Sequence, residues 1–493
     1  MSTPLPSPTF PPALFAGRRY AVLGLGRNGL PAARALLAMG AEVAVWDDGE
    51  AARDAAAAEG LDVRRPDFAP DFTAEAFDAL VASPGIPHRL PAPNPVAAEA
   101  VAAGVPVLSD AELLFQAVRG TDSRARFVGI TGTNGKSTTT ALLAHILAAI
   151  GVRVAAGGNL GPAALALPLL GNDGVYVLEM SSYMLERLAT LRFDAAALLN
   201  LSPDHLDRHG DMAGYVAAKR HVFDRRNGTE LAVIGVDDTF SAGLAAAMPG
   251  CVRISGREPA AGEADCFVSA GHLRDVRGAR GLRLSDAPAL PGAHNAQNIA
   301  AAVAMATWLA ADLGLSTTAA RIDAAVRSFP GLPHRQQRVA ERGGIAYVDD
   351  SKATNADAAA RALGCYPRLV WIAGGVAKFG GIEALAPHFP AVAHALLIGR
   401  DAPLLAATLA AAGVSHEVAG TLEAAVPRAA RAAAALGAEV VLLSPACASF
   451  DQFSGFEARG LRFAELARAL PGCGDAPARP DLARPDLARE DAA

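Results

Sequence analysis

A glycine-rich turn at residues 131–136 constrains the fold of this chain more than any other feature of its sequence. The turn reads Thr131-Gly132-Thr133-Asn134-Gly135-Lys136, with a predicted buried strand over 127–131 before it and a predicted helix over 136–150 after it. In such a unit the loop N–H groups and the lysine face phosphate oxygens, and the hydroxyl of Ser137 can bind Mg²⁺. The segment is a narrower variant of the common phosphate-binding loop, because Ile130 stands where that loop has its first glycine.

The same alternation of strand, turn and helix begins near residue 20 and starts again near 121 and 331. A length of 493 residues agrees with this pattern, since about 150 residues per domain predicts roughly three domains. We expect an α/β protein whose three domains each surround a mostly parallel sheet: Rossmann-like, P-loop ATPase-like and Rossmann-like, in chain order. The predicted boundaries are 1–121, 122–330 and 331–470, with a disordered tail over 471–493.

Runs of apolar residues predict individual strands and helices. Strands are predicted at 20–23, 42–46, 127–131, 175–179, 195–199, 231–235, 345–348, 369–373, 395–398 and 440–443. Helices are predicted at 30–39, 136–150, 212–224 and 295–311. The first dozen or so residues are rich in proline and are expected to be loose.

Composition excludes several classes of protein. The net charge is 44 − 50 = −6 and hydrophobic residues make up 52% of the chain, which argues against a nucleic-acid-coating protein and against general disorder. The five cysteines form no Cys-x-x-Cys pair, so neither a disulfide framework nor a zinc ribbon is expected. The N-terminus lacks the features of a signal peptide, and no run of about 18 apolar residues predicts a membrane span. We therefore expect a cytoplasmic protein without a nucleic-acid partner.

A second glycine turn lies in the first domain. Gly24-Leu25-Gly26-Arg27-Asn28-Gly29 separates the predicted strand 20–23 from the predicted helix 30–39, and Asp47 ends the next strand. This arrangement is typical of a site for a diphosphate and a ribose, but a tight strand–helix turn needs the same glycines. Both interpretations stay open on these residues alone. Nothing downstream resembles hydride-transfer machinery that would favour NAD.

Further segments resemble the superfamily of ATP-dependent Mur ligases and folylpolyglutamate synthetases. Besides the Gly132–Ser137 variant, they are Ser83–Ile86, Gly158–Gly161, Leu178–Tyr183, Asp204–His209, Gly292–Asn298, Gly331–Arg335, Asp350–Asn355 and Ser444–Phe453. The resemblance extends from about residue 18 to about residue 470. The Asp350–Asn355 and Ser444–Phe453 segments are similar to those of the D-glutamate-adding branch of the superfamily.

The resemblance implies a ligase that uses ATP and Mg²⁺ in the synthesis of peptidoglycan precursors. ATP would phosphorylate the carboxylate of UDP-N-acetylmuramoyl-L-alanine to an acyl phosphate, and the amine of D-glutamate would attack it. Mg²⁺ and cationic side chains would offset the repulsion between the carboxylate and the triphosphate. The resemblance further implies that the central and C-terminal domains close over ATP, and we expect a monomer.

The resemblance also implies roles for single residues. The catalytic residues are Lys136, Glu179, His205 and Lys219, and the metal ligands are Ser137, Glu179, His205 and, if carbamylated, Lys219. The ATP-binding residues are Gly132, Thr133, Asn134, Gly135, Lys136, Ser137, Thr138, Asn298, Arg335 and Asp350. The residues that bind the UDP substrate are Gly26, Arg27, Asn28, Asp47, Gly85 and Asn159. The residues that bind the amino acid are Lys352, Thr354, Lys378, Ser449, Phe450 and Phe456. His209 is expected to be structural.

Other functions remain open on the sequence. A related ligase could take L-glutamate, a later peptide residue or a folate-type acceptor. An NAD-dependent oxidoreductase would explain the first-domain turn but not the second. A non-catalytic nucleotide-binding module is disfavoured by the joint presence of Lys136, Glu179, His205 and Lys219.

Overall fold

The computed structural model describes residues 10–68, 77–159, 161–276, 282–378, 380–472 and 474–475. The chain divides into two compact units. One comprises the residues up to Asp286 together with Asn295–Arg327, and the other comprises Ala287–His294 and the chain from Ser328 onward. The predicted domain boundaries remain predictions. Residues 1–9 of the predicted loose N-terminus, and 473 and 476–493 of the predicted tail, lie outside the described residues.

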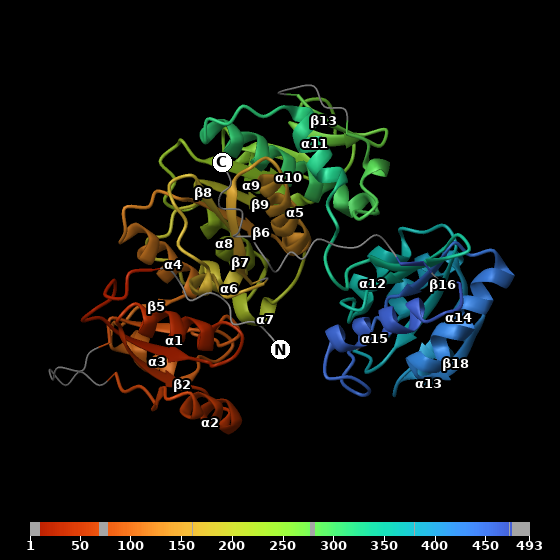
Figure 1. Ribbon diagram of the computed structural model, residues 1–493, viewed down its shortest axis with the longest axis horizontal. Helices are drawn as coiled ribbons and strands as arrows, with labels where there is room; N and C mark the ends of the chain where they lie inside the picture. Colours follow the sequence, from red (N-terminus) through yellow and green to blue (C-terminus); the bar gives the residue numbers. More distant parts are fainter. Residues whose placement is uncertain are drawn as a thin grey trace, which may run out of the picture. The chain divides into compact units, whose positions relative to one another are not determined.

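The first sheet is parallel throughout, in the strand order β3-β2-β1-β4-β5 (Figure 1). Its strands are β1 (Arg19–Leu23), β2 (Glu42–Trp46), β3 (Asp62–Val63), β4 (Ala79–Ala82) and β5 (Val107–Leu108). Its helices are α1 (Gly29–Ala38), α2 (Glu50–Ala58), α3 (Pro95–Ala102) and α4 (Asp110–Arg119). Strand β1 lies between β2 and β4, so the strand order reverses direction at β1. Open α/β sheets bind ligands at the carboxyl ends of the strands at such a point.

The second sheet has the order β13-β12-β11-β10-β9-β6-β8-β7, and only its β12–β13 pair is antiparallel among the pairings described. Its strands are β6 (Arg126–Thr131), β7 (Arg153–Gly158), β8 (Gly174–Glu179), β9 (Ala195–Leu198), β10 (Leu231–Gly235), β11 (Val252–Ser255), β12 (Cys266–Ser269) and β13 (His272–Asp275). Its α-helices are α5 (Lys136–Ala149), α6 (Ser182–Leu185), α7 (Leu206–His209), α8 (Met212–Arg220), α9 (Thr239–Ala246), α10 (Ala293–Asp312) and α11 (Ala319–Arg327). Short 3₁₀ helices are η1 (Ala164–Ala166), η2 (His221–Phe223) and η3 (Leu284–Asp286). Because β6 lies between β8 and β9, the loops after these three strands meet at one edge.

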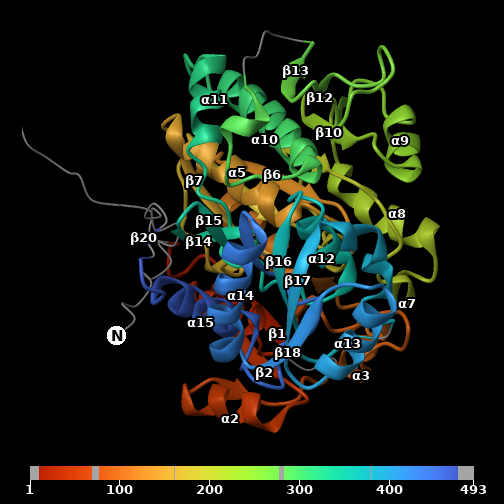
Figure 2. The same cartoon turned by 90° about the vertical axis from the view of Figure 1, so that its right-hand side faces the viewer.

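The third sheet has the order β18-β17-β16-β19-β15-β14-β20, with β14 antiparallel to both of its neighbours (Figure 2). Its strands are β14 (Gln337–Arg342), β15 (Ile345–Asp349), β16 (Leu369–Gly374), β17 (Val392–Ile398), β18 (His416–Gly420), β19 (Val440–Leu443) and β20 (Gly474–Asp475). Its helices are α12 (Ala356–Leu363), η4 (Glu383–Ala391), α13 (Ala402–Ala411), α14 (Leu422–Leu436) and α15 (Phe456–Arg468). Alternate residues of β16 face opposite sides, so that Trp371 packs with α12 and α13 while Val370 and Ile372 pack with α14 and α15.

The sequence predicts the buried strands well. All ten predicted strands coincide with observed ones, and their ends differ by at most three residues. The four predicted helices are also present, although the one predicted over 212–224 ends at Arg220 and continues as η2. The strands without a prediction include β7, which is rich in glycine and alanine, and the more exposed strands β13, β14 and β18. Their apolar pattern is weak because they lie at or near sheet edges or carry small side chains.

Two further expectations can be compared with the structure. Within the described part of the chain, no helix is both long enough and apolar enough to cross a bilayer. No disulfide framework is expected from the sequence. The four cysteines in the described ranges are free thiols, namely Cys251, Cys266, Cys365 and Cys447.

Helix α4 ties the first sheet to the second through a buried carboxylate. Glu112 is fully buried, and its side chain accepts hydrogen bonds from the backbone N–H groups of Ala189 (3.0 Å), Thr190 (2.9 Å) and Leu191 (2.9 Å). These three amides belong to the segment that leads into β9. One apolar core extends across both sheets on this side, and α4 contributes Leu113 and Leu114 to it.

We predict that Glu112→Ala destabilises the unit that holds these two sheets. The substitution leaves three amides without their acceptor, which should lower the free energy of unfolding by about 3 kcal/mol. Calorimetry of the full chain should show the corresponding transition at a lower temperature. Glu99→Ala is the control, because Glu99 forms an exposed ion pair with Arg65 and its loss should have little effect. Equal transition temperatures for the two variants would contradict the prediction.

Candidate functional site

The loops after β1 and β4 enclose a pocket of about 410 Å³. All the residues that the resemblance assigns to the UDP substrate line it, namely Gly26, Arg27, Asn28, Asp47, Gly85 and Asn159. Asn159 follows β7, whereas the others belong to loops of the first sheet. The pocket therefore brings together residues of both sheets in this unit.

The Asp47 carboxylate stabilises the glycine turn of this pocket by hydrogen bonds. Its Oδ2 accepts a hydrogen bond from the backbone N–H of Leu25 (2.7 Å), and its Oδ1 accepts one from Gly49 (2.8 Å). The turn tolerates no side chain at Gly29, since a Cβ there would lie 1.8 Å from the carbonyl oxygen of Gly24. This close packing brings the start of α1 against the pocket, and the positive end of the helix dipole suits an anionic ligand.

Arg187 and Arg208, which are not among the predicted site residues, hold the Ser83–Ile86 loop that lines the pocket. Arg187 is buried and donates hydrogen bonds to the carbonyl oxygens of Ala82 (2.8 Å), Ser83 (2.9 Å) and Ile86. Arg208 donates to the carbonyl oxygen of Gly85 (2.9 Å). Burial lowers the pKa of Arg187 to about 10, so it remains a cation at neutral pH. These arginines fix the Ser83–Ile86 loop from the side of the second sheet.

Asn159 connects the pocket to a buried carboxylate. Its Nδ2 donates a 2.7 Å hydrogen bond to Oε1 of Glu179, the last residue of β8. The other oxygen, Oε2, is buried and has no hydrogen-bond partner among the described residues. A buried carboxylate oxygen without a partner is costly, so this atom is a candidate ligand for a cation.

The second glycine turn wraps around the start of α5. Gly135 has φ 84°, a left-handed conformation that favours glycine, and a Cβ there would lie 2.2 Å from Oδ1 of Asn298. The Lys136 ammonium donates hydrogen bonds to the carbonyl oxygens of Gly132 (2.9 Å) and Thr133 (2.8 Å). Ser137 is buried at the first turn of the helix. The lysine and the hydroxyl thus lie at the same turn, whereas the N–H groups of Thr133 and Asn134 donate to Asn200.

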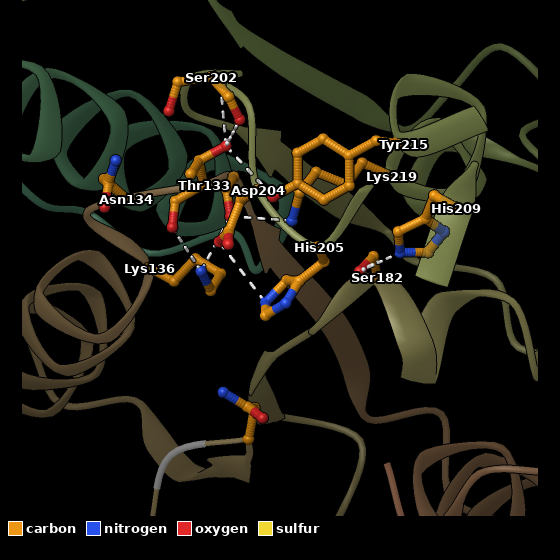
Figure 3. Close-up of polar contacts among 12 residues, drawn as sticks. Thr133, Asn134, Lys136, Ser182, Ser202, Asp204, His205, His209, Tyr215 and Lys219 are labelled. Carbon is orange, nitrogen blue, oxygen red and sulfur yellow. Dashed lines mark hydrogen bonds and ion pairs between the residues drawn. The ribbon is translucent and has the colours of Figure 1, made fainter. Parts of the chain in front are cut away.

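Lys219 reaches the same loop from α8. It is only 2% exposed, and its Nζ donates hydrogen bonds to the Gly132 carbonyl oxygen (2.9 Å) and to Oγ1 of Thr131 (3.3 Å). Figure 3 shows Lys136 and Lys219 directed toward this loop from opposite sides. Burial, and then the nearby charge of Lys136, lower the pKa of Lys219 well below its usual value. Composition alone would make Lys219 a surface lysine; the structure instead buries it, which fits the role implied by the resemblance.

His205 lies at the start of α7 with φ 52°, an unusual conformation for a histidine. Its ring lies 5.1 Å from the ring of Tyr183, and its Nε2 is 3.5 Å from Oδ2 of Asp204 (Figure 3). Burial lowers the pKa of His205, and the Asp204 carboxylate opposes this shift. His209 is buried, and its Nε2 is 2.9 Å from Oγ of Ser182, which agrees with the structural role expected for it.

Asn200 is a residue of this site that the sequence analysis missed. Its Oδ1 accepts from the backbone N–H of Asn134 (2.9 Å) and its Nδ2 donates to the carbonyl oxygen of Asn134 (3.2 Å). Its own carbonyl oxygen accepts from the N–H of Thr133 (2.8 Å). Asn200 therefore fixes the conformation of the phosphate-binding loop. Its position just after β9, the strand beside β6, is the signal that could have identified it.

Asn298 lies on α10 behind the same loop. It is buried, and its Oδ1 accepts a 3.2 Å hydrogen bond from Oγ1 of Thr139. Asn298 therefore packs against Gly135, in addition to its predicted contact with ATP.

The other two predicted ATP-binding residues, Arg335 and Asp350, belong to the second unit. Asp350 is buried just after β15, where its carboxylate accepts hydrogen bonds from Oγ of Ser444 (2.7 Å) and the N–H of Gln336 (3.2 Å). Burial raises its pKa to about 7 despite these bonds. Arg335 is exposed, and its charge favours the ionised form of Asp350.

The residues predicted to bind the amino acid surround the carboxyl ends of β15, β16 and β19. Lys352 and Thr354 follow β15, Lys378 follows β16, and Ser449 and Phe450 follow β19. Phe456 begins α15, and the Lys352 ammonium lies 3.9 Å from the centre of its ring. Ser449 is buried, whereas Lys378 is exposed and Phe450 is 76% exposed.

The described residues contain no cluster of three or more His, Cys, Asp or Glu side chains that could hold a metal ion by themselves. Mg²⁺ does not require such a cluster, because it commonly binds one or two carboxylates together with substrate phosphates and water. Glu179 and the Ser137 hydroxyl fit this donor set.

Comparison with known proteins identifies relatives of the whole chain. Residues 130–306 match the family described as Mur ligase middle domain. The chain is 48% identical over 471 residues to a UDP-N-acetylmuramoylalanine–D-glutamate ligase of Paramagnetospirillum magneticum, with 92% of this chain and 97% of the relative covered. It is 46% identical over 468 residues to the enzyme of the same name from Caulobacter vibrioides, with the same coverage.

Solved structures support the fold. The crystal structure of UDP-N-acetylmuramate-alanine ligase from Thermotoga maritima superposes with a TM-score of 0.57 at 18% sequence identity. The match covers 91% of this chain and 98% of that one. The order of three α/β regions predicted from the sequence is therefore confirmed.

We predict that the raised pKa of Asp350 makes stability depend on pH. The folded chain holds a proton on this carboxyl up to about pH 7, whereas the unfolded chain releases it near pH 4, so stability falls as the pH rises through this window. Asp350→Asn cannot ionise. The difference in melting temperature between Asp350→Asn and the parent should therefore increase from about pH 5 to about pH 8. Expressed as a free energy of unfolding, this increase should be roughly 1–4 kcal/mol.

The control for this comparison is Asp357→Asn, because Asp357 is 80% exposed. Its difference in melting temperature from the parent should stay flat over the same range. A flat difference for Asp350→Asn as well would show that this carboxyl is not held protonated.

Proposed function

Because the chain belongs to the family of UDP-N-acetylmuramoylalanine–D-glutamate ligases, we propose that it joins D-glutamate to UDP-N-acetylmuramoyl-L-alanine with the hydrolysis of ATP to ADP and phosphate. The product is a precursor of peptidoglycan. The observation that carries the proposal is the meeting of Lys136, Lys219 and Glu179 at the carboxyl ends of three adjacent strands, with Asn159 linking Glu179 to the nucleotide pocket. A cytoplasmic location follows from the use of ATP and a UDP-linked substrate.

The pocket of the first sheet is the proposed site for the UDP group. The start of α1 and the guanidinium of Arg27 supply positive charge for the diphosphate, and Asp47 stands where an acid binds ribose hydroxyls. Asn159 marks the side of the pocket toward which the muramoyl-alanine end would extend. Its contact with Glu179 supports a position for the substrate carboxylate near the phosphate-binding loop.

ATP is proposed to bind the second glycine turn. Lys136 donates to carbonyl oxygens of its own loop, and the β- and γ-phosphates of ATP would be stronger acceptors for the same ammonium. Ser137 and Glu179 would hold Mg²⁺, which when bound neutralises the phosphate charges. Asn298, Arg335 and Asp350 are proposed as further ATP ligands.

Lys219 is proposed to carry a carbamate. Its burial and the neighbouring Lys136 charge favour the neutral amine, which is the nucleophilic form. The amine nitrogen would form a bond to the carbon of CO₂ and lose one proton, so a cation site becomes an anion site. Such an anion beside Gly132 would supply a further oxygen ligand for Mg²⁺ and would relieve the repulsion between the two lysines.

The chemistry then needs two transfers. A carboxylate oxygen of the substrate attacks the γ-phosphorus, the bond to the bridging oxygen of ADP breaks, and an acyl phosphate forms. The neutral amine of glutamate attacks the acyl carbon, inorganic phosphate leaves, and the nitrogen loses one proton to solvent or to a base, so that the amide keeps one N–H. His205 lies beside Asp204 near this region, and its lowered pKa keeps it neutral and able to accept a proton.

Glutamate is proposed to bind at the carboxyl ends of β15, β16 and β19 in the second unit. Lys352 and Lys378 provide positive charge for its two carboxylates, and Thr354 and Ser449 provide hydroxyl groups. Phe450 and Phe456 provide apolar surface for the side-chain methylene groups. Ser449 is buried at the end of this group, where its backbone carbonyl caps the turn at Gln452 and Phe453.

Phosphate release tests the proposed reaction. The protein is supplied with ATP, Mg²⁺ and UDP-N-acetylmuramoyl-L-alanine, and D-glutamate, L-glutamate or no amino acid is added. We expect release only with D-glutamate, and a loss of at least about 100-fold in Lys136→Ala, because the lysine charge on the transferred phosphate is removed. Release with L-glutamate alone would overturn the stereochemical assignment, and no release with either would overturn the proposed function. A change in NAD absorbance would instead favour an oxidoreductase.

Activity in the absence of CO₂ tests the carbamate. We expect the parent protein to lose activity in CO₂-depleted buffer and to regain it with bicarbonate, and Lys219→Met to be inactive under both conditions. The chain has only four lysines, at 136, 219, 352 and 378, so a ¹³C-carbamate signal from labelled bicarbonate is simple to assign. Lys352→Met is the control and should keep this signal. Full activity of the parent without CO₂ would contradict the carbamate.

A further inference from the structure

A buried arginine holds together the loops of the second unit that carry the proposed glutamate site. Arg459 lies on α15 and is 1% exposed. Its Nε donates to Oγ of Ser351 (2.9 Å), and its Nη2 donates to the Ser351 carbonyl oxygen (3.0 Å). Both terminal nitrogens donate to the Cys447 carbonyl oxygen at 3.1 Å, and Nη1 also approaches the carbonyl oxygen of Gly374 (3.4 Å). One guanidinium therefore contacts three separate segments.

These segments follow neighbouring strands. Ser351 follows β15, Cys447 follows β19, and Gly374 ends β16, and β19 pairs with both of the other strands. Every proposed glutamate-binding residue lies within a few positions of one of these anchors or on α15 itself. Lys352 and Thr354 follow Ser351, Lys378 follows Gly374, and Ser449 and Phe450 follow Cys447. Phe456 begins the helix of Arg459, and its carbonyl oxygen accepts from the Ser351 hydroxyl (2.9 Å).

The segments also contact one another beside Arg459. The N–H of Val376 donates to the Ala448 carbonyl oxygen (2.8 Å), and the N–H of Ala448 donates to the Val376 carbonyl oxygen (2.9 Å). This single bridge lies between two of the anchors. Without the guanidinium, the carbonyl oxygens of Ser351 and Cys447 would be buried acceptors without their donor, and the loops would be free to rearrange.

The carboxylates that favour the charged form of Arg459 are those of Asp451 and Asp349. In the part of the chain that the structure describes, no carboxylate forms an ion pair with it. Asp349 is close in sequence to the first anchor, but its two oxygens accept from the Ser351 N–H (2.9 Å) and pair with Nδ1 of His334 (2.7 Å). Burial lowers the pKa of Arg459 to about 10, which still leaves a cation at neutral pH. A buried cation behind these loops favours an anionic ligand on their other side.

We propose that Arg459 is a positioning residue for the amino-acid subsite, where its guanidinium fixes the three loops and its charge attracts the carboxylates of glutamate. This inference rests on the proposed function, since it assumes that glutamate binds these loops. It assigns no contact between Arg459 and the substrate. Its consequence is selective: the affinity for the amino acid depends on Arg459, whereas binding of the UDP substrate in the first unit does not.

Three variants of α15 test the proposal. Arg459→Lys keeps the charge but cannot bridge three segments, and Arg459→Met removes both charge and hydrogen bonds. Arg462→Met is the matched control on the same helix, because Arg462 is only partly buried and pairs with Glu423 and Glu465. KM is measured for each of the three substrates in the phosphate-release assay, together with kcat and the melting temperature.

We expect Arg459→Lys to raise KM for D-glutamate by about 10-fold or more while KM for the UDP substrate stays within about 2-fold of the parent. KM for ATP should likewise change less than KM for the amino acid. Arg459→Met should raise KM for D-glutamate further, and Arg462→Met should resemble the parent. If Arg459→Met does not fold, Arg459→Lys alone decides the outcome.

An unchanged KM for D-glutamate in Arg459→Lys would overturn the proposal. An equal rise of all three KM values, or a fall in melting temperature with no selective change in KM, would also overturn it, because either result indicates a general structural role. Failure of the proposed function is a different result, since it would appear in the parent protein as no release that depends on glutamate.

Discussion

The parallel pairing of β6 with β8 and β9 is the constraint on which the candidate site depends. Parallel strands end at the same edge of a sheet, so the phosphate-binding loop after β6, Glu179 at the end of β8 and Asn200 after β9 must meet there. The Gly132 carbonyl oxygen then accepts hydrogen bonds from two lysines at once. Burial of Lys219, and then the nearby charge of Lys136, lower the pKa of Lys219 well below its usual value.

Buried arginines hold loops together in this chain. The only four lysines of the sequence are residues assigned to sites, whereas the remaining cations are arginines. Two of these arginines are buried and serve as frameworks: Arg187 holds the Ser83–Ile86 loop and Arg459 holds the loops after β15, β16 and β19. A planar guanidinium with five N–H donors can satisfy several carbonyl oxygens at once, which a lysine cannot do with fixed geometry.

Much of the architecture follows from local pattern. The glycine turns, the buried apolar runs and the helices after them are recognisable because each depends on neighbours in sequence, and the corresponding elements are found where they are predicted. Strands such as β7 and β14 were missed, since small side chains or edge positions leave no clear alternation. Lys136 and Glu179 could be proposed as site residues for the same local reason, because each lies within a motif.

The sequence by itself determined the three α/β regions and the glycine turn between β6 and α5, and the predicted role of each motif rests on the sequence alone. Only the tertiary structure decided that Lys219 is buried, that Glu179 keeps one oxygen without a partner, and that Asn200, Arg187 and Arg459 hold the loops in place. Burial and hydrogen bonding join residues that are far apart in the chain, so no local pattern contains them. The pKa of a lysine or a carboxyl depends on that environment and not on the residue type alone.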